Sequence, residues 1–144
     1  MPRPDTEDEF LNRLRYDEKL GWYRVEAEVD GAPVELFIEA DRDDLAPVLT
    51  RARQLVADLE KHARGAKDYA VARFLNLKNE EWLEDDEAPV TPEEFRQRMA
   101  LQFVSVFANG DVAFYHADGG MFRDHTISIV MDGNDQFVGA DVPG

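Results

Sequence analysis

The sequence predicts an α+β protein with a mainly antiparallel sheet and helices packed on one of its faces. Apolar residues alternate with polar ones over residues 10–40, recur at helical spacing over residues 45–77, and alternate again over residues 101–142. Runs of strands separated by a run of helices are typical of this class. We expect the order β-β-β-α-α-α-β-β-β-β, with residues 1–9 as a frayed N-terminal tail and residues 10–144 as a single α+β domain.

The first strands are predicted from residues 10–16 and from a clean alternation over residues 22–29. Trp22 begins the polar side of the second segment, and the other side is apolar throughout. Asp30-Gly31 then favours a tight turn, and residues 34–40 continue the same apolar face on a returning strand.

Helical spacing of apolar residues replaces this alternation between Leu45 and Leu59. Asp43 or Asp44 can cap the start of this helix, and Pro47 is tolerated because it lies in the first turn. Gly65 is a plausible C-terminal stop, after which residues 70–77 predict a second helix.

The most specific local pattern is Thr91-Pro92-Glu93-Glu94, a capping box with proline at the first helical position. The threonine oxygen can accept the N–H of the third residue, while the glutamate reaches back to the cap. We expect a short third helix that begins here and runs to about Arg98.

The last part of the chain predicts two hairpins. Asn109-Gly110 between residues 101–107 and 112–116 is a strong signal for a two-residue type I′ turn. With that turn Phe107 would face Val112, and one face of the hairpin would hold the residues Phe103, Phe107, Val112 and Phe114. Asp132-Gly133 predicts a further turn between strands at residues 126–131 and 137–142.

Composition and charge exclude several classes of function. The 144 residues contain no cysteine, which excludes disulfides, zinc fingers and a cysteine nucleophile. The net charge of −15 repels nucleic acids and anionic membranes, and it favours a basic protein partner. No apolar run approaches the roughly 20 residues of a membrane span, so the cytoplasm is the expected location. We expect no cofactor.

Candidate catalytic residues are few. Ser105 and Ser128 are the only serines, and both lie within predicted strands rather than in a nucleophile elbow. Two imidazoles with nearby carboxylates are suitable ligands for a divalent transition metal. The candidates for such an edge are His116, Asp118, Asp124 and His125. Their spacing matches no metal motif, and a turn histidine beside a strand-end histidine explains the pattern better.

A surface for a partner is the other candidate. Residues 80–94 hold eight acidic residues and no basic one, and Trp82 precedes the acidic loop. Exposed aromatic residues mark interfaces more often than other exposed residues, and Trp22 and Phe122 are further candidates of this kind. Trp82 could instead pin the loop onto the core. The predicted docking surface consists of Glu80, Glu81, Trp82, Glu84, Asp85, Asp86 and Glu87.

Several fragments together resemble the bacterial "domain of unknown function 2262" family. They are Gly21-Trp22-Tyr23, residues 77–83 (LKNEEWL), Thr91 to Phe95, Phe122 to Ile127, and the ending Ala140 to Gly144. The resemblance covers nearly the whole chain after about Leu14. It implies a bacterial cytoplasmic α+β protein, and it implies no activity, cofactor or catalytic residue.

Two hypotheses of different classes follow. The first is a non-enzymatic binding protein with an acidic surface for a basic partner, similar in general kind to the immunity proteins of toxin systems. That last likeness is an analogy between fold classes. The alternative is a metal-dependent hydrolase or small-ligand protein that uses the His116–His125 edge.

Overall fold

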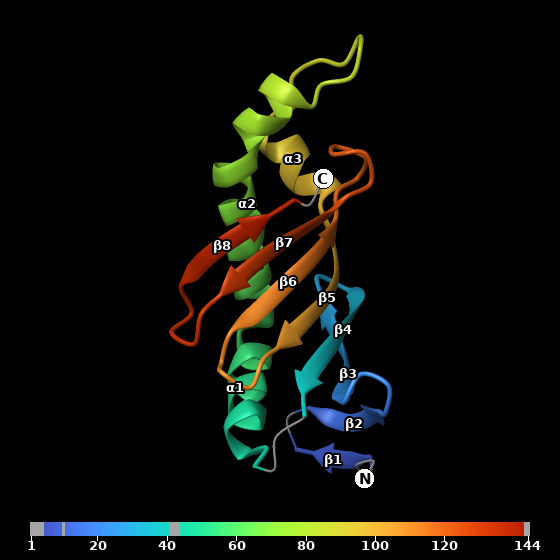
Figure 1. Ribbon diagram of the computed structural model, residues 1–144, viewed down its shortest axis with the longest axis vertical. Helices are drawn as coiled ribbons and strands as arrows, with labels where there is room; N and C mark the ends of the chain where they lie inside the picture. Colours follow the sequence, from blue (N-terminus) through green and yellow to red (C-terminus); the bar gives the residue numbers. More distant parts are fainter. Residues whose placement is uncertain (1–4, 10, 41–43, 143–144) are drawn as a thin grey trace.

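The computed structural model describes residues 5–9, 11–40 and 44–142. Eight strands form one sheet in which they follow each other in sequence order (Figure 1). The strands are β1 (Thr6–Asp8), β2 (Asn12–Asp17), β3 (Trp22–Val29), β4 (Ala32–Glu39), β5 (Ala100–Val106), β6 (Val112–Ala117), β7 (Thr126–Met131) and β8 (Phe137–Asp141). The helices α1 (Ala46–Ala57), α2 (Leu59–Glu81) and α3 (Pro92–Arg98) all lie between β4 and β5.

The sheet is mainly antiparallel, as predicted. Every neighbouring pair of strands is antiparallel except β4 and β5, which run parallel with Leu36 opposite Val104. The exception arises because the chain crosses the sheet through the three helices before it returns beside β4, and such a crossover connects parallel strands. The fold is therefore α+β.

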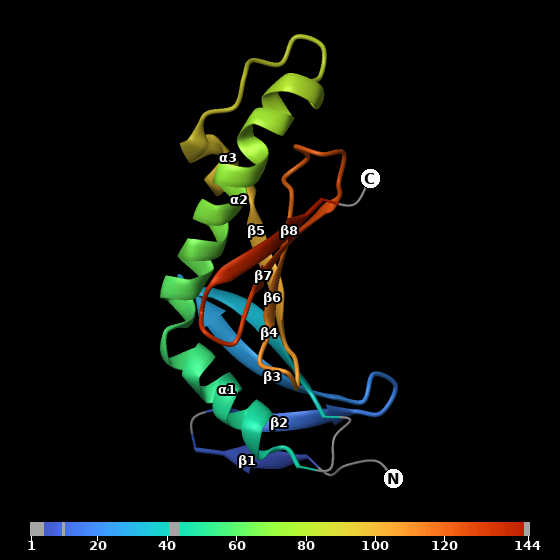
Figure 2. The ribbon, with the colours of Figure 1, turned by 60° about the vertical axis from the view of Figure 1, so that its left-hand side comes forward.

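The helices cover one face of the sheet and leave the other open (Figure 2). Along β3 the side chains of Tyr23, Val25 and Val29 are buried, whereas Arg24 and Glu26 are exposed. This period-two pattern gives each strand one face toward the helices. The core between the layers includes Leu14, Leu36, Ile38, Ala52, Leu55, Ala66, Ala70, Phe95, Val104, Val106, Phe114, Ile127 and Ile129.

The chain begins with four strands rather than the predicted three. Thr6–Asp8, inside the stretch expected to be a tail, pairs with β2 as β1, and residues 1–4 lie outside the described residues. The Asp8 carboxylate accepts hydrogen bonds from Arg53 of α1, with its Oδ2 2.5 Å from Nη2. This long-range contact fixes the short strand, and no local pattern in the sequence predicts it.

The predicted stop at Gly65 is wrong, because α2 continues through it. A Cβ at this position would lie 2.8 Å from Cε2 of Phe137 in β8. Glycine therefore serves a close approach between helix and sheet rather than a helix end. The helical run is interrupted instead at Asp58, between α1 and α2.

The helix starts follow the predicted chemistry in part. Thr91 Oγ1 accepts the N–H of Glu94 at 3.1 Å, and Pro92 occupies the first turn, as the capping box predicts. Pro47 also lies in the first turn of α1. There Asp44 Oδ1 accepts the N–H of Ala46 at 3.0 Å, while Asp43 lies outside the described residues.

The turn at Asn109-Gly110 is longer than predicted, and this changes the register. Gly110 has a φ of 96°, but Asn109 does not have a positive φ, so the turn is not type I′. The N–H of Phe107 donates to the carbonyl of Asp111, which encloses a three-residue loop. Val106 therefore faces Val112, and this one-residue slip exchanges the two faces of β5.

Arg51 of α1 ties two turns to the helix. Its buried guanidinium donates to the carbonyl oxygens of Gly110 and Asp132, at 2.8 and 2.9 Å. It also pairs with Asp135 Oδ1 at 2.7 Å. The β5–β6 and β7–β8 turns are thus held side by side at one end of the sheet.

Candidate binding site on the open face of the sheet

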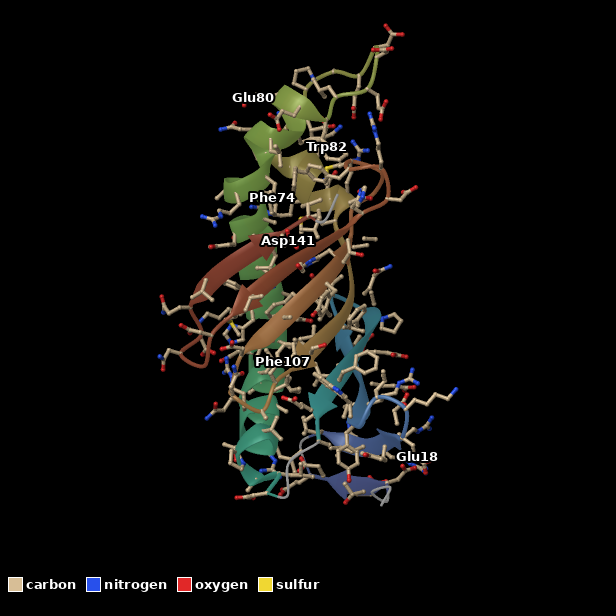
Figure 3. The ribbon with its side chains drawn as sticks, viewed as in Figure 1. Glu18, Phe74, Glu80, Trp82, Phe107 and Asp141 are labelled. Atoms are coloured by element: carbon tan, nitrogen blue, oxygen red, sulfur yellow. The ribbon has the colours of Figure 1, made fainter. Side chains whose placement is uncertain are left out.

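Five aromatic side chains lie on the face of the sheet that the helices leave open. We call this set the aromatic face; it consists of Trp22, Phe37, Phe103, Phe107 and Tyr115. All five are half-buried, although no helix or strand among the described residues packs over them. The labelled Phe107 marks this face where β5 ends (Figure 3).

The rings contact one another across four strands. Trp22 meets Phe107 edge-on with centroids 5.5 Å apart, and Phe37 meets Phe103 in the same way at 5.6 Å. Phe103 and Tyr115 stack with centroids 4.5 Å apart. Such contacts hold aromatic side chains in fixed orientations, so the face is ordered before anything binds.

Small residues lie between the rings. Ser105 lies opposite Phe37 on β4 and opposite Ala113 on β6. The small side chains of Ser105 and Ala113 are buried beneath their larger neighbours. A hollow of about 430 Å³ opens over Ser105, lined also by Leu20 and Trp22. Leu20 is 57% exposed, which is unusual for so large an apolar side chain.

Carboxylates border the aromatic face. Glu35 pairs with Arg24 at 2.8 Å, and Arg24 lies over the ring of Phe37 with 5.6 Å from Cζ to the centroid. Glu39, opposite Trp22, accepts the N–H of Ala108 at 2.7 Å. Residues 100–142 contain no lysine and a single arginine, Arg123, which lies between β6 and β7. The strands β5 to β8 therefore carry neither lysine nor arginine.

An ordered aromatic surface with polar borders is the composition of a protein–protein interface. The face holds no histidine or lysine, and Ser105 beneath the rings has no base beside it.

The predicted acidic docking loop lies at the far end of α2 (Figure 3). The carboxylates of Glu80, Glu81, Glu84, Asp85 and Asp86 are exposed, as a docking surface requires.

Glu87 differs from the other acidic residues of this loop. Its Oε1 lies 2.8 Å from Nζ of the buried Lys78, and Arg98 lies 3.4 Å from its Oε2. The hydrogen bond from Lys78 lowers the pKa of Glu87 to about 2, helped by the N–H of Glu84. Glu87 thus closes the loop onto the protein.

Trp82 contacts the body of the protein. Its ring lies 5.5 Å from that of Phe122 and 5.9 Å from that of His125, with Arg123 over it at 5.7 Å. Phe122, which we considered as a surface aromatic, is fully buried. These contacts are consistent with a structural role in which Trp82 holds the loop against the protein. A role of Trp82 in binding a partner stays a prediction.

The alternative metal edge is not assembled as a ligand set. His116 is fully buried on the helix-facing side, and its Nδ1 lies 3.2 Å from the carbonyl of Ile127. Asp118 accepts the N–H groups of Gly120, Phe122 and His125, so its oxygens organise the loop. The described part of the chain contains no group of three or more His, Asp or Glu placed to hold a metal ion.

Sequence reasoning missed most of the aromatic face. It placed Trp22 on the open side correctly, but it put Phe103 and Phe107 on one face with Val112. The signal that could have corrected this is the pair Val104 and Val106, whose β-branched side chains alternate with the aromatic ones. Helix-facing valines require the aromatic residues to face outward.

The fold is that of an α+β protein with five aromatic side chains on the open face of its sheet. Residues 8–142 match the family described as an uncharacterised protein conserved in bacteria (DUF2262), and the chain belongs to this family. No curated protein and no solved structure matches it.

The described residues contain no helix that is both long enough and apolar enough to span a membrane.

Proposed function

We propose that this protein is a non-enzymatic binding protein whose aromatic face docks onto a basic protein partner. The observation that carries the proposal is the set of five aromatic rings, in contact as the pair Trp22–Phe107 and the group Phe37, Phe103 and Tyr115, on a sheet face that no described element covers. Aromatic side chains in the centre of an interface contribute most of its binding energy.

The charge distribution supports a basic partner. Glu26, Glu35 and Glu39 border the face, and the net charge of the chain is −15. A partner with an apolar centre and lysines or arginines around it complements both features. A second copy of this chain would bring two acidic borders together, which opposes association. A role like that of immunity proteins would be one form of such binding, supported by analogy of fold class alone.

The test compares wild type with a variant of the face. Phe103→Ala with Tyr115→Ala removes the stacked pair, whereas Asn76→Ala on the exposed side of α2 serves as a matched control. A partner bound through the face is retained from bacterial lysate by wild type and the control and is lost by the double variant. With that partner purified, titration should show binding at least tenfold weaker for the double variant.

Circular dichroism and thermal melting should first show that the double variant is folded. Equal affinity of folded variant and wild type would place the partner elsewhere and overturn the proposal. A dimer that forms with increasing concentration and is lost in the double variant would identify a second copy as the occupant instead.

A further inference from the structure

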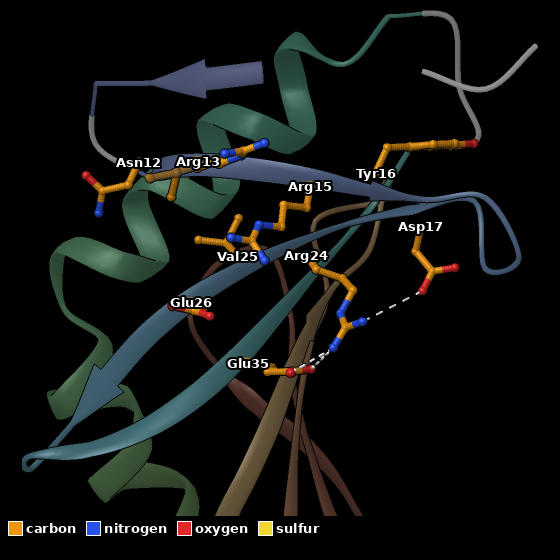
Figure 4. Close-up of a pocket in the computed structure, with 10 residues that line it drawn as sticks. Asn12, Arg13, Arg15, Tyr16, Asp17, Arg24, Val25, Glu26 and Glu35 are labelled. Atoms are coloured by element: carbon orange, nitrogen blue, oxygen red, sulfur yellow. Dashed lines mark hydrogen bonds and ion pairs between the residues drawn. The ribbon is translucent and has the colours of Figure 1, made fainter. Parts of the chain in front are cut away.

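The edge of β3 is free over part of its length because β2 leaves it. The β2–β3 ladder consists of Asp17 opposite Trp22, Tyr16 opposite Tyr23, and Arg15 opposite Arg24, and it ends there. Beyond Arg24 the two strands diverge, which opens a wedge between them (Figure 4). Residues 25–29 remain paired with β4 on one side, and no strand of the described residues pairs with them on the other.

The hairpin geometry identifies the backbone groups that face the wedge. Asp30 and Gly31 both have positive φ, 50° and 81°, so they form a two-residue turn flanked by the hydrogen-bonded pair Val29 and Ala32. Hydrogen-bonded pairs alternate with non-bonded pairs along an antiparallel ladder. Glu26 and Glu28 therefore direct their N–H and C=O groups away from β4, toward the wedge. Pro33, which has no N–H to donate, lies opposite Glu28.

Open space adjoins this edge on both faces of the sheet. Three hollows of about 390, 470 and 820 Å³ share Asn12 and Glu26 in their linings. The second of them lies between the β3 edge and the junction of α1 with α2, where it is bordered by Val56 and Leu59. The free edge is thus accessible from both faces of the sheet.

We propose that an extended basic peptide segment of a partner adds to the sheet beside residues 25–29 of β3. Unpaired strand edges bind extended segments through backbone hydrogen bonds, and side chains on alternate positions give specificity.

The side chains around the edge define the pattern of that peptide. Every second side chain would lie beside Glu26 and Glu28 on the open face, where Lys or Arg forms favourable cross-strand pairs. The other side chains would point toward Ala27, Val56 and Leu59, which favours apolar residues. The hollow on the open face contains Glu26, Glu28 and Glu35 and no basic residue, so its charge complements a basic segment. The other two hollows have mixed charge, with Arg13, Arg15 and Arg24 in the first and Lys61 and Arg64 beside Asp58 and Glu60 in the second, so the basic side chains of the peptide are expected beside Glu26 and Glu28.

This site adjoins the aromatic face and shares Glu26 and Glu35 with its border, and the probes keep the two apart. The probe is a fluorescein-labelled peptide of eight alternating lysine and valine residues, compared with an alternating glutamate–valine peptide. A third peptide repeats the lysine–valine sequence with N-methyl groups on alternate amides, which removes the hydrogen bonds of one strand edge. Strand addition predicts that only the first peptide binds.

Amide hydrogen exchange of the free protein and of the complex is the most direct measurement. The amides of Glu26 and Glu28 should exchange rapidly in the free protein, while that of Ala27, paired with Val34, exchanges slowly. Addition of the lysine–valine peptide should slow exchange at Glu26 and Glu28 at least tenfold. Slow exchange at both amides before any peptide is added would overturn the proposal.

Charge variants complete the test. Glu26→Lys with Glu28→Lys should weaken binding of the lysine–valine peptide about fivefold to tenfold. Glu84→Lys with Asp85→Lys changes the net charge equally at the far end of α2 and should leave the affinity within about twofold. Equal losses in both variants, or equal binding of the N-methylated peptide, would show non-specific charge attraction. Loss of peptide binding in the Phe103→Ala, Tyr115→Ala variant would assign the peptide to the aromatic face.

Discussion

Burial of a single titratable side chain lowers the folding stability of this protein, and the surrounding fold compensates for that loss. This side chain is His116, whose imidazole is fully buried among the apolar residues between sheet and helices. Its Nδ1–H donates to Ile127, and Nε2 is the buried side-chain atom without a partner among the described residues. Burial lowers the pKa of His116 to about 4, and the positive charge of Lys67 acts in the same direction. Burial also lowers the pKa of Lys67.

The folding stability should therefore depend on pH through His116. In the unfolded chain its pKa is near 6.5, so between pH 6.5 and 4 the unfolded state binds the proton and the folded state does not. Stability from this residue is complete above pH 6.5 and is lost as the pH falls toward 4, by roughly 2–3 kcal/mol. The variant His116→Gln keeps a donor for Ile127 and does not titrate. Its free energy of unfolding should therefore fall by roughly 2–3 kcal/mol less than that of wild type between pH 7 and 4.

Urea unfolding at both pH values measures this effect. His125→Gln is the matched control, because it leaves His116 in place and should retain the wild-type loss. Identical pH dependence of His116→Gln and wild type would mean that the imidazole is not held neutral by burial.

At the scale of elements, the sequence was informative where a local pattern sets the structure. The alternation of β3 and β4, the turn at Asp30-Gly31 and the cap at Thr91 were all predicted, because each depends on neighbours within a few residues. The predicted register of β5 and β6 was wrong by one residue. Turn length decides register, and Asn109-Gly110 occurs in turns of both two and three residues.

Contacts between distant segments account for the other differences. Gly65 has the composition of a helix stop, but its role is set by Phe137, seventy-two positions later (137 − 65). The pairing of β1 depends in the same way on Arg53 of α1. The aromatic face was therefore unpredictable as a unit, because four strands from both halves of the chain supply its rings.

The cap of α3 gives a prediction at this scale. Thr91→Ala removes the acceptor of the Glu94 N–H and should lower the free energy of unfolding by roughly 1 kcal/mol. Thr91→Ser keeps the oxygen and should stay near wild type. The midpoint of chemical denaturation measures both variants, and an unchanged midpoint in Thr91→Ala would show that the cap contributes nothing to stability.

Viewed as a whole, the molecule is elongated, with the acidic loop after α2 at one end and β1 and β2, beside α1, at the other (Figure 1). The 23 residues of α2 span about 34 Å, so the loop lies well beyond the Debye length from the N-terminal strands at physiological salt. Over such a separation the loop charges are largely screened at physiological salt, and they would act on a basic partner bound elsewhere only at low salt, where the Debye length rises to roughly 30 Å. Trp82 and Glu87 hold the loop in place. Glu84, Asp85 and Asp86 are exposed, and Glu84 forms a surface ion pair with Arg123 at 3.6 Å.

This separation predicts that the exposed loop carboxylates act on the rate of association. The triple variant Glu84→Gln, Asp85→Asn, Asp86→Asn changes the net charge from −15 to −12 (−15 + 3). Electrostatic steering depends on summed charge, so association with the basic partner should slow severalfold at low salt and depend less steeply on salt. Dissociation and melting temperature should stay unchanged, because solvated charges contribute little to stability.

Glu87→Gln is the contrasting variant: it leaves Lys78 buried without its ion pair and should lower the melting temperature instead. Stopped-flow kinetics over a salt series separates these effects, and an unchanged association rate in the triple variant would restrict the acidic loop to a structural role.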